Sequence, residues 1–595
     1  MNIKKILIGL FLAILPFSSI ASHLMGGEIT WKCNGNGQFV FQIKLYRDCN
    51  GIPGPPSVTL NTNAPVGFIP CSLVSQNDLS PQGVGCPTCL NPLGLSSAVE
   101  EDIYESGPIF LVGIPPLTGW YFYYNDCCRN GAITNLSSSS SGDFTLRAYM
   151  FPISGQNNSP CFDSSPYFAE PPTFGICTRD SVNLSFAAFD QDMDSLVFAF
   201  APALENIFPG NNVPYASGYS FGAPLPKTQH NPLNVPAILN TSSGQLSMTS
   251  YTPGYFVVVM EVTSYRCGAI ISKIYREFQL SILSNCILST TPTTTYNTAP
   301  DIITLPYSET ITISAGDTLY YIFHATENEL LPTSAGGGLQ TMTLSAASNA
   351  LGFGDTSMTT GCLIPPCAVL SNPTPFSYAS NLFEGLSWAT ECQHAGFQNG
   401  CLQHTRNYHF IFTIKDNYCP VPGVSTKSLI VKVTGPTIYS AGNSLAVSFP
   451  GSTYQWYLYG APIPGATDSL YTPTQSGTYS LLLTANNGCT LLSNSMYIGF
   501  AGIDNNHHQE TKIEAFPNPS AGNNIINVLV QNLKTGQNVI RIVDISGKMV
   551  KQIPIYISTK DEHLLIDLSD LSSGVYSLNL SGEGEIHQTQ LVLTN

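Results

Sequence analysis

Residues 184–205 read LSFAAFDQDMDSLVFAFAPALE, and this apolar stretch is followed by SGQLSMTSYTPGYFVVVMEVTSY at 243–265 and IISKIYREFQLSILSNC at 270–286. Each segment contains a run of β-branched and aromatic residues, and turns rich in Gly and Pro separate the runs. Short apolar runs bounded by turn residues are typical of strands buried in a sandwich. The three segments therefore predict the strands of one β-sandwich.

The composition extends this prediction to the whole chain. Charged residues make up only 10% of the 595 residues, against roughly 25% in an average globular protein, and helices need such residues on their solvent-facing side. The 50 Gly, 43 Pro, 29 Tyr and 30 Phe favour short strands and many turns. We predict an all-β protein of tandem β-sandwich domains, about four to six of them at this length.

Charge and hydropathy limit the partners of the chain. Its formal net charge of -16 repels a phosphate backbone, which argues against nucleic acid as a ligand. After the N-terminal segment, no apolar stretch is long enough to cross a bilayer as a helix, so we expect no transmembrane helix in the mature form.

The N-terminus carries an export signal. Lys4 and Lys5 precede an apolar stretch at 6–20, and small residues then occupy the two positions that a signal peptidase reads. Residues 1–21 are therefore predicted to be a cleaved signal peptide, and the mature chain to begin near Ser22. The apolar stretch is too short to remain as a stable membrane anchor.

Seventeen cysteines fit an exported protein, and sixteen of them lie before residue 420. Their number is odd, so one thiol is expected to stay free or to pair with another molecule. The adjacent Cys127 and Cys128 are expected to take different partners. Close spacing predicts three local disulfides: Cys86 with Cys89, Cys362 with Cys367, and Cys392 with Cys401.

Turn-rich and polar segments divide the chain into predicted modules. A disulfide-stapled β domain, a cadherin-like β-sandwich, a Thr/Pro/Ser-rich linker and a further β domain are expected at 22–155, 156–286, 287–299 and 300–434. An Ig-like domain, a polar linker and a small C-terminal sandwich of four to seven strands are expected at 437–499, 500–511 and 512–595.

Residues 437–499 resemble an immunoglobulin-like module. Trp456 lies in the middle of a predicted strand, where a core tryptophan packs, and Tyr479 lies on a late strand. Cys489 is the only cysteine in this segment, so the usual disulfide between the two sheets is absent. Packing alone is expected to hold the module together.

The C-terminal segment contains three motifs in a fixed order: Phe516-Pro517-Asn518-Pro519, then Val543-Asp544-Ile545-Ser546-Gly547-Lys548, then Leu571-Ser572-Ser573-Gly574-Val575-Tyr576. These motifs resemble the type A sorting domain of the type IX secretion system of Bacteroidetes. The resemblance implies passage across the outer membrane by the type IX machinery and a secreted or cell-surface location. Its motif residues here are Pro517, Asn518, Pro519, Asp544, Gly547, Lys548, Gly574 and Tyr576.

Residues from about 22 to 434 are similar to large surface proteins of the same bacteria that are grouped with gliding motility and adhesion. The similarity is carried by SHLMGGEITWKC, LYRDCNG, CCRNGAITNL, FDQDMDSL, GLSWATEC and DNYCPVP. It implies a non-enzymatic protein of adhesion or of the cell envelope, with a surface polysaccharide or another surface protein as partner. The alternatives are an array of carbohydrate-binding modules and an extracellular hydrolase within 22–434.

Asp190, Asp192 and Asp194 form the candidate metal site. Three carboxylates at alternate positions of a loop can direct oxygens at one Ca²⁺ ion, and the segment resembles the Asp-rich motif of cadherin-like repeats. Met193 stands where those relatives usually have Gly. The alternative is a solvated acidic turn.

Two further patterns favour structural roles over catalysis. Gly218-Tyr219-Ser220-Phe221-Gly222 matches a hydrolase nucleophile elbow, but the prolines that follow exclude the required helix, which predicts a plain turn. Five residues have the spacing of zinc ligands: Cys392, His394, Cys401, His404 and His409. In an oxidising compartment, however, a disulfide between Cys392 and Cys401 is favoured over zinc.

Four Asp-Ser/Thr-aliphatic triplets resemble the O-glycosylation motif of Bacteroidetes. They begin at Asp180, Asp194, Asp317 and Asp468. Motifs of zinc proteases, P-loop enzymes and dinucleotide-binding enzymes are absent from the sequence. The sequence thus predicts where the protein goes more sharply than what it binds.

Overall fold

The structure is a computed structural model that describes residues 24–593 except 35–36, 82–85, 93–97, 128, 138–142, 153–162, 187, 209–210, 267, 290–293, 307, 353–360, 373, 396–404, 448, 450–452, 485–488, 500–511, 517, 519, 521–524, 532–535, 545–547, 558–561 and 583–584. The chain divides into two compact units, residues 1–499 and 500–595. The predicted signal peptide 1–21 and the linker 500–511 lie outside the described residues. In the described part every regular element is a strand apart from two short 3-10 helices, which confirms the all-β prediction.

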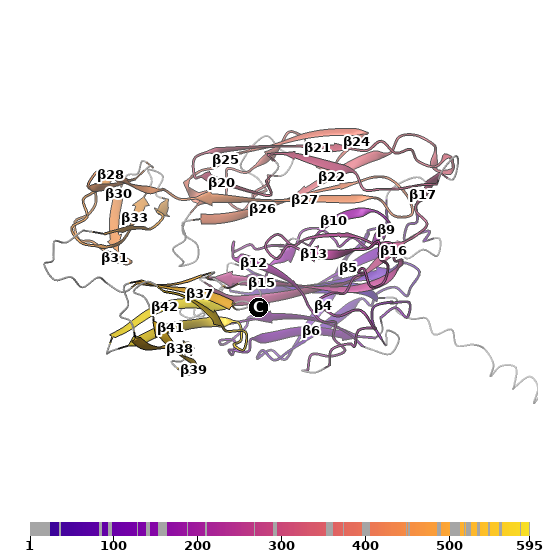
Figure 1. Cartoon of the computed structure of the whole chain (residues 1–595). Helices are drawn as coiled ribbons and strands as arrows, with labels where there is room; N and C mark the ends of the chain where they lie inside the picture. Colours follow the sequence, from indigo (N-terminus) through magenta and orange to yellow (C-terminus); the bar gives the residue numbers. More distant parts are fainter. Residues whose placement is uncertain are drawn as a thin grey trace, which may run out of the picture. The chain divides into compact units, whose positions relative to one another are not determined.

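The largest sheet of unit 1 closes on itself. Its strands are paired in the order β1-β2-β5-β4-β3-β6-β7-β16-β15-β12, β9 pairs with β16, and β1 also pairs with β16. Among its strands, β4, β5, β6, β9, β12, β15 and β16 are labelled in Figure 1. The bounds are β1 (Leu24–Cys33), β2 (Phe39–Asp48), β3 (Ser57–Thr62), β4 (Phe68–Asp78), β5 (Val99–Ser106), β6 (Trp120–Asp126), β7 (Phe144–Met150), β9 (Gly175–Cys177), β12 (Ser195–Phe200), β15 (Gly254–Arg266) and β16 (Ala269–Leu283). Hydrogen bonds therefore cross the predicted boundary between 22–155 and 156–286, and both segments contribute to one sheet.

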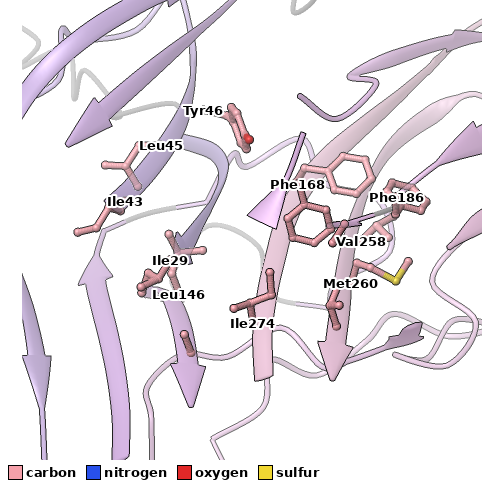
Figure 2. Close-up of a cluster of buried hydrophobic side chains, with 14 of the residues drawn as sticks. Ile29, Ile43, Leu45, Tyr46, Leu146, Phe168, Phe186, Val258, Met260 and Ile274 are labelled. Atoms are coloured by element: carbon pink, nitrogen blue, oxygen red, sulfur yellow. The ribbon is translucent and has the colours of Figure 1, made fainter. Parts of the chain in front are cut away.

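The apolar runs of the sequence form the centre of this sheet. Strands β15 and β16 pair along their full length, from Gly254 opposite Ile282 to Arg266 opposite Ala269. Gly268 has a φ of 79° in the short connection, a conformation that a tight hairpin turn requires. Side chains from β1, β2, β7, β15 and β16 then fill the core (Figure 2), among them Ile29, Ile43, Leu146, Val258, Met260 and Ile274.

A second sandwich in unit 1 packs an eight-stranded sheet against a four-stranded one. The larger sheet has the order β13-β14-β10-β27-β26-β22-β24, with β20 beside β27, and the smaller has the order β19-β21-β25-β23. The bounds are β10 (Ser181–Ser185), β13 (Val235–Leu239), β14 (Gln245–Thr249), β19 (Asp301–Leu305), β20 (Thr310–Ser314), β21 (Thr318–Thr326), β22 (Thr341–Ala347), β23 (Val369–Leu370), β24 (Phe376–Ala379), β25 (Asn381–Ala389), β26 (Thr405–Lys415) and β27 (Val424–Thr434). Strands from the predicted domain 156–286 thus share a sheet with strands from 300–434.

The remaining elements of these regions are short. Two strand pairs, β8 (Tyr167–Phe168) with β11 (Ala188–Phe189) and β17 (Ile287–Ser289) with β18 (Thr295–Tyr296), accompany the 3-10 helices η1 (Thr333–Ala335) and η2 (Cys392–His394). The β17–β18 pair lies in the predicted linker 287–299. Asn297 of that linker is buried and its side chain donates a hydrogen bond of 2.8 Å to Asp416, so this segment is anchored to the second sandwich.

Residues 437–499 form a small sandwich with the core that the Ig-like resemblance predicts. Trp456 is fully buried and its ring N–H donates to the carbonyl of Asp468 at 2.8 Å. The Tyr479 hydroxyl donates to the carbonyl of Gln475 at 2.7 Å, as in a tyrosine corner. The strands are β28 (Ile438–Ala441), β29 (Ser444–Val447), β30 (Thr453–Leu458), β31 (Ala461–Pro462), β32 (Leu470–Tyr471), β33 (Gly477–Thr484), β34 (Thr490–Leu492) and β35 (Met496–Ile498).

The disulfides correct two of the three predicted local pairs. Cys362 bonds to Cys367 as predicted. The predictions for Cys86 and Cys392 are wrong, because sheet formation brings distant cysteines closer than their sequence neighbours. The other disulfides with both cysteines described are Cys49–Cys89, Cys86–Cys419, Cys177–Cys286 and Cys392–Cys489.

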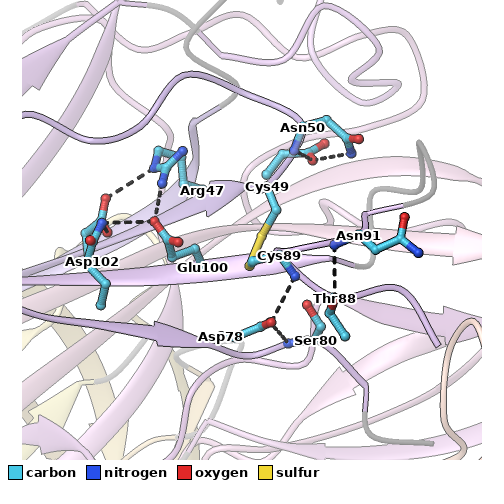
Figure 3. The surroundings of a disulfide bond; sticks show 12 residues. Arg47, Cys49, Asn50, Asp78, Ser80, Thr88, Cys89, Asn91, Glu100 and Asp102 are labelled. Carbon is cyan, nitrogen blue, oxygen red and sulfur yellow. Dashed lines mark hydrogen bonds and ion pairs between the residues drawn. A yellow bond between two sulfur atoms is a disulfide. The ribbon is translucent and has the colours of Figure 1, made fainter. Parts of the chain in front are cut away.

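The Cys49–Cys89 disulfide lies beside a network of charged residues (Figure 3). Arg47 forms ion pairs with Glu100 and Asp102, next to the strand end that carries Cys49. Among the cysteines that the structure describes, the free thiol is Cys71, which is completely buried. Cys127 is disulfide-bonded, while Cys128 and Cys401 lie outside the described residues.

The Cys392–Cys489 disulfide also corrects the prediction that packing alone holds the Ig-like module. It ties Cys489, which directly precedes β34 of the module, to η2 of the preceding sandwich. Leu483 and Leu491 of the module join the core of that sandwich as well. The module is therefore both packed and covalently fixed to its neighbour.

Unit 2 is a sandwich of its own. Its sheets have the orders β36-β37-β40 and β39-β38-β41-β42, and their buried faces enclose residues such as Ile526, Ile540 and Leu578. The seven strands found among the described residues agree with the predicted four to seven. They are β36 (Lys512–Phe516), β37 (Ile525–Gln531), β38 (Gly536–Asp544), β39 (Met549–Ile557), β40 (Glu562–Asp567), β41 (Gly574–Gly582) and β42 (Glu585–Leu593).

Candidate functional site

The acidic loop, residues 190–194, connects β11 to β12 and does not use its three carboxylates alike. Asp190 is buried and turns back onto its own loop, where its Oδ1 accepts the backbone N–H groups of Asp192 at 2.8 Å and Asp194 at 3.2 Å. Its Oδ2 accepts the hydroxyl of Ser264 at 3.3 Å. Asp190 therefore shapes the loop instead of facing a shared ion.

A different trio of carboxylates comes together. Oxygens of Asp163, Asp192 and Asp194 lie within 4.8 Å of one another. Arg266 from the end of β15 enters this cluster, with its Nη2 at 2.6 Å from Asp194, 3.3 Å from Asp163 and 3.5 Å from Asp192. Its Nε donates to the second oxygen of Asp194 at 2.8 Å. The guanidinium thus supplies positive charge at the place where the sequence predicts calcium.

One positive charge does not balance this group of carboxylates. Burial and the neighbouring Asp190 raise the pKa of Asp163 well above its ordinary value, although Arg266 opposes the shift. Burial likewise raises the pKa of Asp194 to about 6 against the effect of Arg266. The Oδ2 of Asp163 is buried and has no hydrogen-bond partner. The crowding of carboxyl groups around one guanidinium therefore favours a proton on Asp163, and one oxygen of Asp163 is left without a partner.

The fit to calcium is partial. Ca²⁺ takes about six to eight oxygens, and the cluster offers three close carboxylates that already contact a guanidinium. Asp163, Asp192 and Asp194 are the residues that would hold the ion, which makes Asp163 a ligand that the sequence pattern missed. No local signal could have found it or Arg266, because each reaches the loop from a distant segment.

The backbone conformation of Met193 accounts for the Gly that is usual at this position in cadherin-like loops. Met193 has a φ of 64°, in the left-handed region that glycine adopts without strain. Its side chain packs against the core of the second sandwich, and Asn349 donates to its sulfur at 2.8 Å. The loop therefore keeps the turn, and the side chain of Met193 fastens it to the neighbouring sheet.

The other sequence patterns form structural features. Ser220 and Ala223 exchange two backbone hydrogen bonds, which confirms a turn in place of a nucleophile elbow. At the zinc-like pattern, Cys392 is in a disulfide, the kind of bond that an oxidising compartment favours over zinc, although its partner is Cys489 and not Cys401. Both ring nitrogens of His394 bond to backbone groups of Glu391 and Ile364. His404, like Cys401, lies outside the described residues, and His409 lies on β26.

The hydroxyl residues of all four predicted glycosylation triplets are exposed. They are Ser181, Ser195, Thr318 and Ser469. The Ser181 hydroxyl is engaged with that of Thr249 at 2.7 Å, so the other three are the freer acceptors. The four hydroxyl residues are therefore accessible from solvent, and their glycosylation stays a prediction.

The first sorting motif fastens the last strand of unit 2. Asn518 donates from its side-chain amide to the carbonyl of Gln590 at 2.7 Å and accepts the N–H of Val592 at 2.8 Å. This side chain therefore pairs with the edge of β42 as a strand backbone would. Pro517 and Pro519 lie outside the described residues.

The other two motifs close turns. Asp544 accepts the N–H of Lys548 at 3.0 Å through its carboxylate, across the turn between β38 and β39. The Tyr576 hydroxyl donates to the carbonyl of Ser572 at 2.8 Å, just before Gly574 starts β41. Gly547 lies outside the described residues. The described motif residues thus fix the turns and the edge of the sorting sandwich.

Comparisons with known proteins agree with the sequence at the C-terminus. Residues 514–594 match the family described as a secretion system C-terminal sorting domain. No curated protein sequence matches the chain. Among the described residues, no helix has the length and apolar character needed to cross a bilayer.

Similar solved structures are multi-domain proteins with very low sequence identity. A biofilm-associated protein BSP domain has 9% identity, 96% coverage of both chains and a TM-score of 0.14. The eight N-terminal Ig domains of Down Syndrome Cell Adhesion Molecule have 10% identity, with 96% of this chain and 63% of that chain covered, and a TM-score of 0.18. A tetra-tandem repeat of a large adhesion protein has 9% identity, coverages of 71% and 100%, and a TM-score of 0.12.

At these TM-scores the similar structures support no statement about function. The sorting domain does, because a domain of this kind directs its carrier through type IX secretion. It implies contact with the type IX machinery, and no transmembrane helix is found in the part of the chain that the structure describes. The protein is therefore exported by the type IX route, to the cell surface or to the outside of the cell.

Proposed function

We propose that the exported protein acts outside the cell as a non-enzymatic adhesion protein, in the cell envelope or in gliding of a Bacteroidetes cell. One observation carries this proposal. The four-stranded sheet of unit 1 buries one side in its sandwich and exposes five large apolar side chains on the other: Ile303, Leu305, Tyr320, Ile322 and Phe383. An exposed apolar patch of this kind on an exported protein is typical of a surface that binds a partner.

The perturbed carboxylates of unit 1 contact structural partners, apart from one oxygen of Asp163, which supports a binding role over catalysis. Asp416, for example, accepts three hydrogen bonds, from the backbone of Tyr418 and Gly423 and from the side chain of Asn297. The alternative of an extracellular hydrolase predicts turnover of pooled glycans or peptides by the purified mature chain. The alternative of a carbohydrate-binding array predicts exposed aromatic rings, and the open side of the β21–β25 pair has them.

Attachment of cells tests the proposal. Cells with an active type IX system would carry the full gene, a gene without residues 512–595, or no copy. We expect attachment to polysaccharide-coated and abiotic surfaces only with the full gene, and loss of surface display without 512–595. Attachment that is equal in all three strains would contradict adhesion, and measurable turnover of a substrate would contradict the non-enzymatic role.

A further inference from the structure

We propose that the outer side of strands β19, β21 and β25 binds a neutral polysaccharide chain, with Tyr320 and Phe383 as its stacking platforms. This inference names the ligand class and the site for the adhesion role proposed above, and it rests on that role for its biological setting only. We refer to the outward side chains of these three strands as the aromatic face.

Strand register places the members of the aromatic face in rows. Ile303, His324 and Phe383 form one row, since Ile303 pairs with His324 and His324 pairs with Phe383. The next row holds Leu305, Ile322 and Gly385, and Tyr320 stands opposite Ser387 in the third. Side chains at alternate positions of each strand share a side, so these rows form one continuous surface.

The two aromatic rings are open to solvent. Tyr320 is 72% exposed and Phe383 is 64% exposed, whereas their chain neighbours Tyr321 and Leu382 are fully buried. The ring of His324 stacks on Phe383 at 4.0 Å between centroids and 12° between planes, which widens the flat surface. Four residues of β21 separate the rows of the two rings, which sets them roughly 14 Å apart along the strands. Two rings at this separation can each stack on a different sugar of one extended chain.

Polar groups lie between and beside the rings. Gly385 leaves the centre of the face without a side chain, and the Ser371 hydroxyl lies 2.8 Å from the place where a Cβ would stand. The Asn381 amide oxygen lies 3.3 Å from Nε2 of His324 at the edge of the face. A sugar presents apolar C–H groups on its ring faces and hydroxyls around its rim, which matches rings flanked by hydroxyl, amide and imidazole groups.

The charge and the area of the aromatic face favour a neutral polysaccharide over other ligands. The outward residues in the three rows carry no carboxylate, guanidinium or ammonium group, although the whole chain has a net charge of -16. The charged outward residue of these strands is Asp301, at the start of β19 and beyond the three rows, so the surface around the rings favours a neutral ligand. Three strands over five residues cover roughly 250 Å², and a stable dimer needs about 800 Å² on each partner. A second copy of the chain would therefore gain too little area here, whereas a narrow polymer would not need more.

Affinity electrophoresis of the purified mature chain tests the inference. Native gels would contain xyloglucan, galactomannan or hydroxyethylcellulose as neutral polymers, or polygalacturonate as an acidic one. We expect at least one neutral polymer to retard the protein, and Tyr320→Ala or Phe383→Ala to weaken the retardation about tenfold. Tyr320→Phe, which keeps the ring, is expected to bind like the wild type.

Two exposed aromatic residues outside the face provide matched controls. Tyr497 is 63% exposed in the Ig-like module and Phe68 is 66% exposed on β4, so Tyr497→Ala and Phe68→Ala should leave binding unchanged. Circular dichroism of each variant would verify that it folds. Retardation by no neutral polymer, by polygalacturonate alone, or equally in all variants would overturn the inference.

Sedimentation velocity tests whether a second copy of the chain, and not a polysaccharide, covers the aromatic face. A dimer that Tyr320→Ala dissociates would show that a second copy covers the face, and it would also overturn the inference. If cells attach to surfaces while the purified chain binds no neutral polymer, this inference fails and the adhesion proposal survives. The two proposals can therefore fail independently.

Discussion

Removing the Cys392–Cys489 disulfide tests how the Ig-like module is held. The bond closes a chain segment of 97 residues, and the chain-entropy treatment assigns about 4.7 kcal/mol to a loop of about 100 residues. Cys392→Ser with Cys489→Ser should therefore lower the free energy of unfolding of unit 1 by up to about 4.7 kcal/mol. The double substitution leaves no unpaired thiol behind, which keeps the comparison clean.

The assay is chemical denaturation of the purified mature chain, with calorimetry and limited proteolysis in parallel. The matched control is Cys362→Ser with Cys367→Ser, which opens a segment of only 5 residues and should cost about 2 kcal/mol by the same treatment. We also expect the module to become the first protease-sensitive part of unit 1. Equal destabilisation by the two double variants, or an unchanged digestion pattern, would refute the view that the bond ties the module to its neighbour.

Four further expectations follow from single groups. Burial raises the pKa of the Cys71 thiol to about 12, so iodoacetamide at pH 8 should label it only after denaturation, and labelling of the native chain would contradict its burial. Burial, with a smaller contribution from Glu327, raises the pKa of Asp416 to about 7; the folded state therefore binds this proton more tightly, and stability should rise as pH falls from 8 to 5 by at most about 1.4 kcal/mol per unit. Asp416→Asn should flatten that rise in pH-dependent melts, and an unchanged slope would contradict the assignment. Arg266→Gln should make the melting temperature depend on Ca²⁺, with a gain near 2.7 kcal/mol at 100-fold excess over Kd, whereas the wild type should respond less; an equal response would show that Arg266 does not take the place of the ion. Asn518→Ala removes two hydrogen bonds to β42 and should cost about 1 kcal/mol for each, measured as a lower melting temperature of unit 2. Asn579→Ala on β41 removes one hydrogen bond, from Ser577, and should cost about half as much; an equal loss in the two variants would contradict the role of Asn518.

Sequence reasoning succeeded where the deciding interactions are local. The sorting motifs are turns and a strand edge, and each described motif residue bonds within unit 2. The Cys362–Cys367 pair is a loop of 5 residues, which spacing alone can predict. Trp456 and Tyr479 were placed correctly in the Ig-like core, because strand periodicity fixes which side chains point inward.

It failed where strands from distant segments meet. Cys86 has Cys89 three positions away, yet it bonds to Cys419 across 333 residues. The closure of the first sheet through the β1–β16 pair likewise joins the two ends of a region that turn signals divide. The acidic loop shows the same limit, because Arg266 and Asp163 reach it only through the fold. The alternating Asp residues predicted three equivalent ligands of one ion, whereas the bend of the loop directs Asp190 onto the backbone of its own loop.

The aromatic face marks a further limit of sequence patterns. Strands β15 and β21 are both apolar at consecutive positions, which is typical of strands covered on two sides. Both sides of β15 are indeed covered, since Val258 and Val259 belong to different buried clusters. On β21 only the side of Tyr321 is covered, and the side of Tyr320 stays open. The apolar residues at consecutive positions of β21 therefore favour contact on both sides of the strand, whereas the fold of this chain covers only the side of Tyr321. In an exported protein the missing contact is most simply made by a partner outside the cell, which is why the adhesion proposal and the polysaccharide inference both begin at this strand.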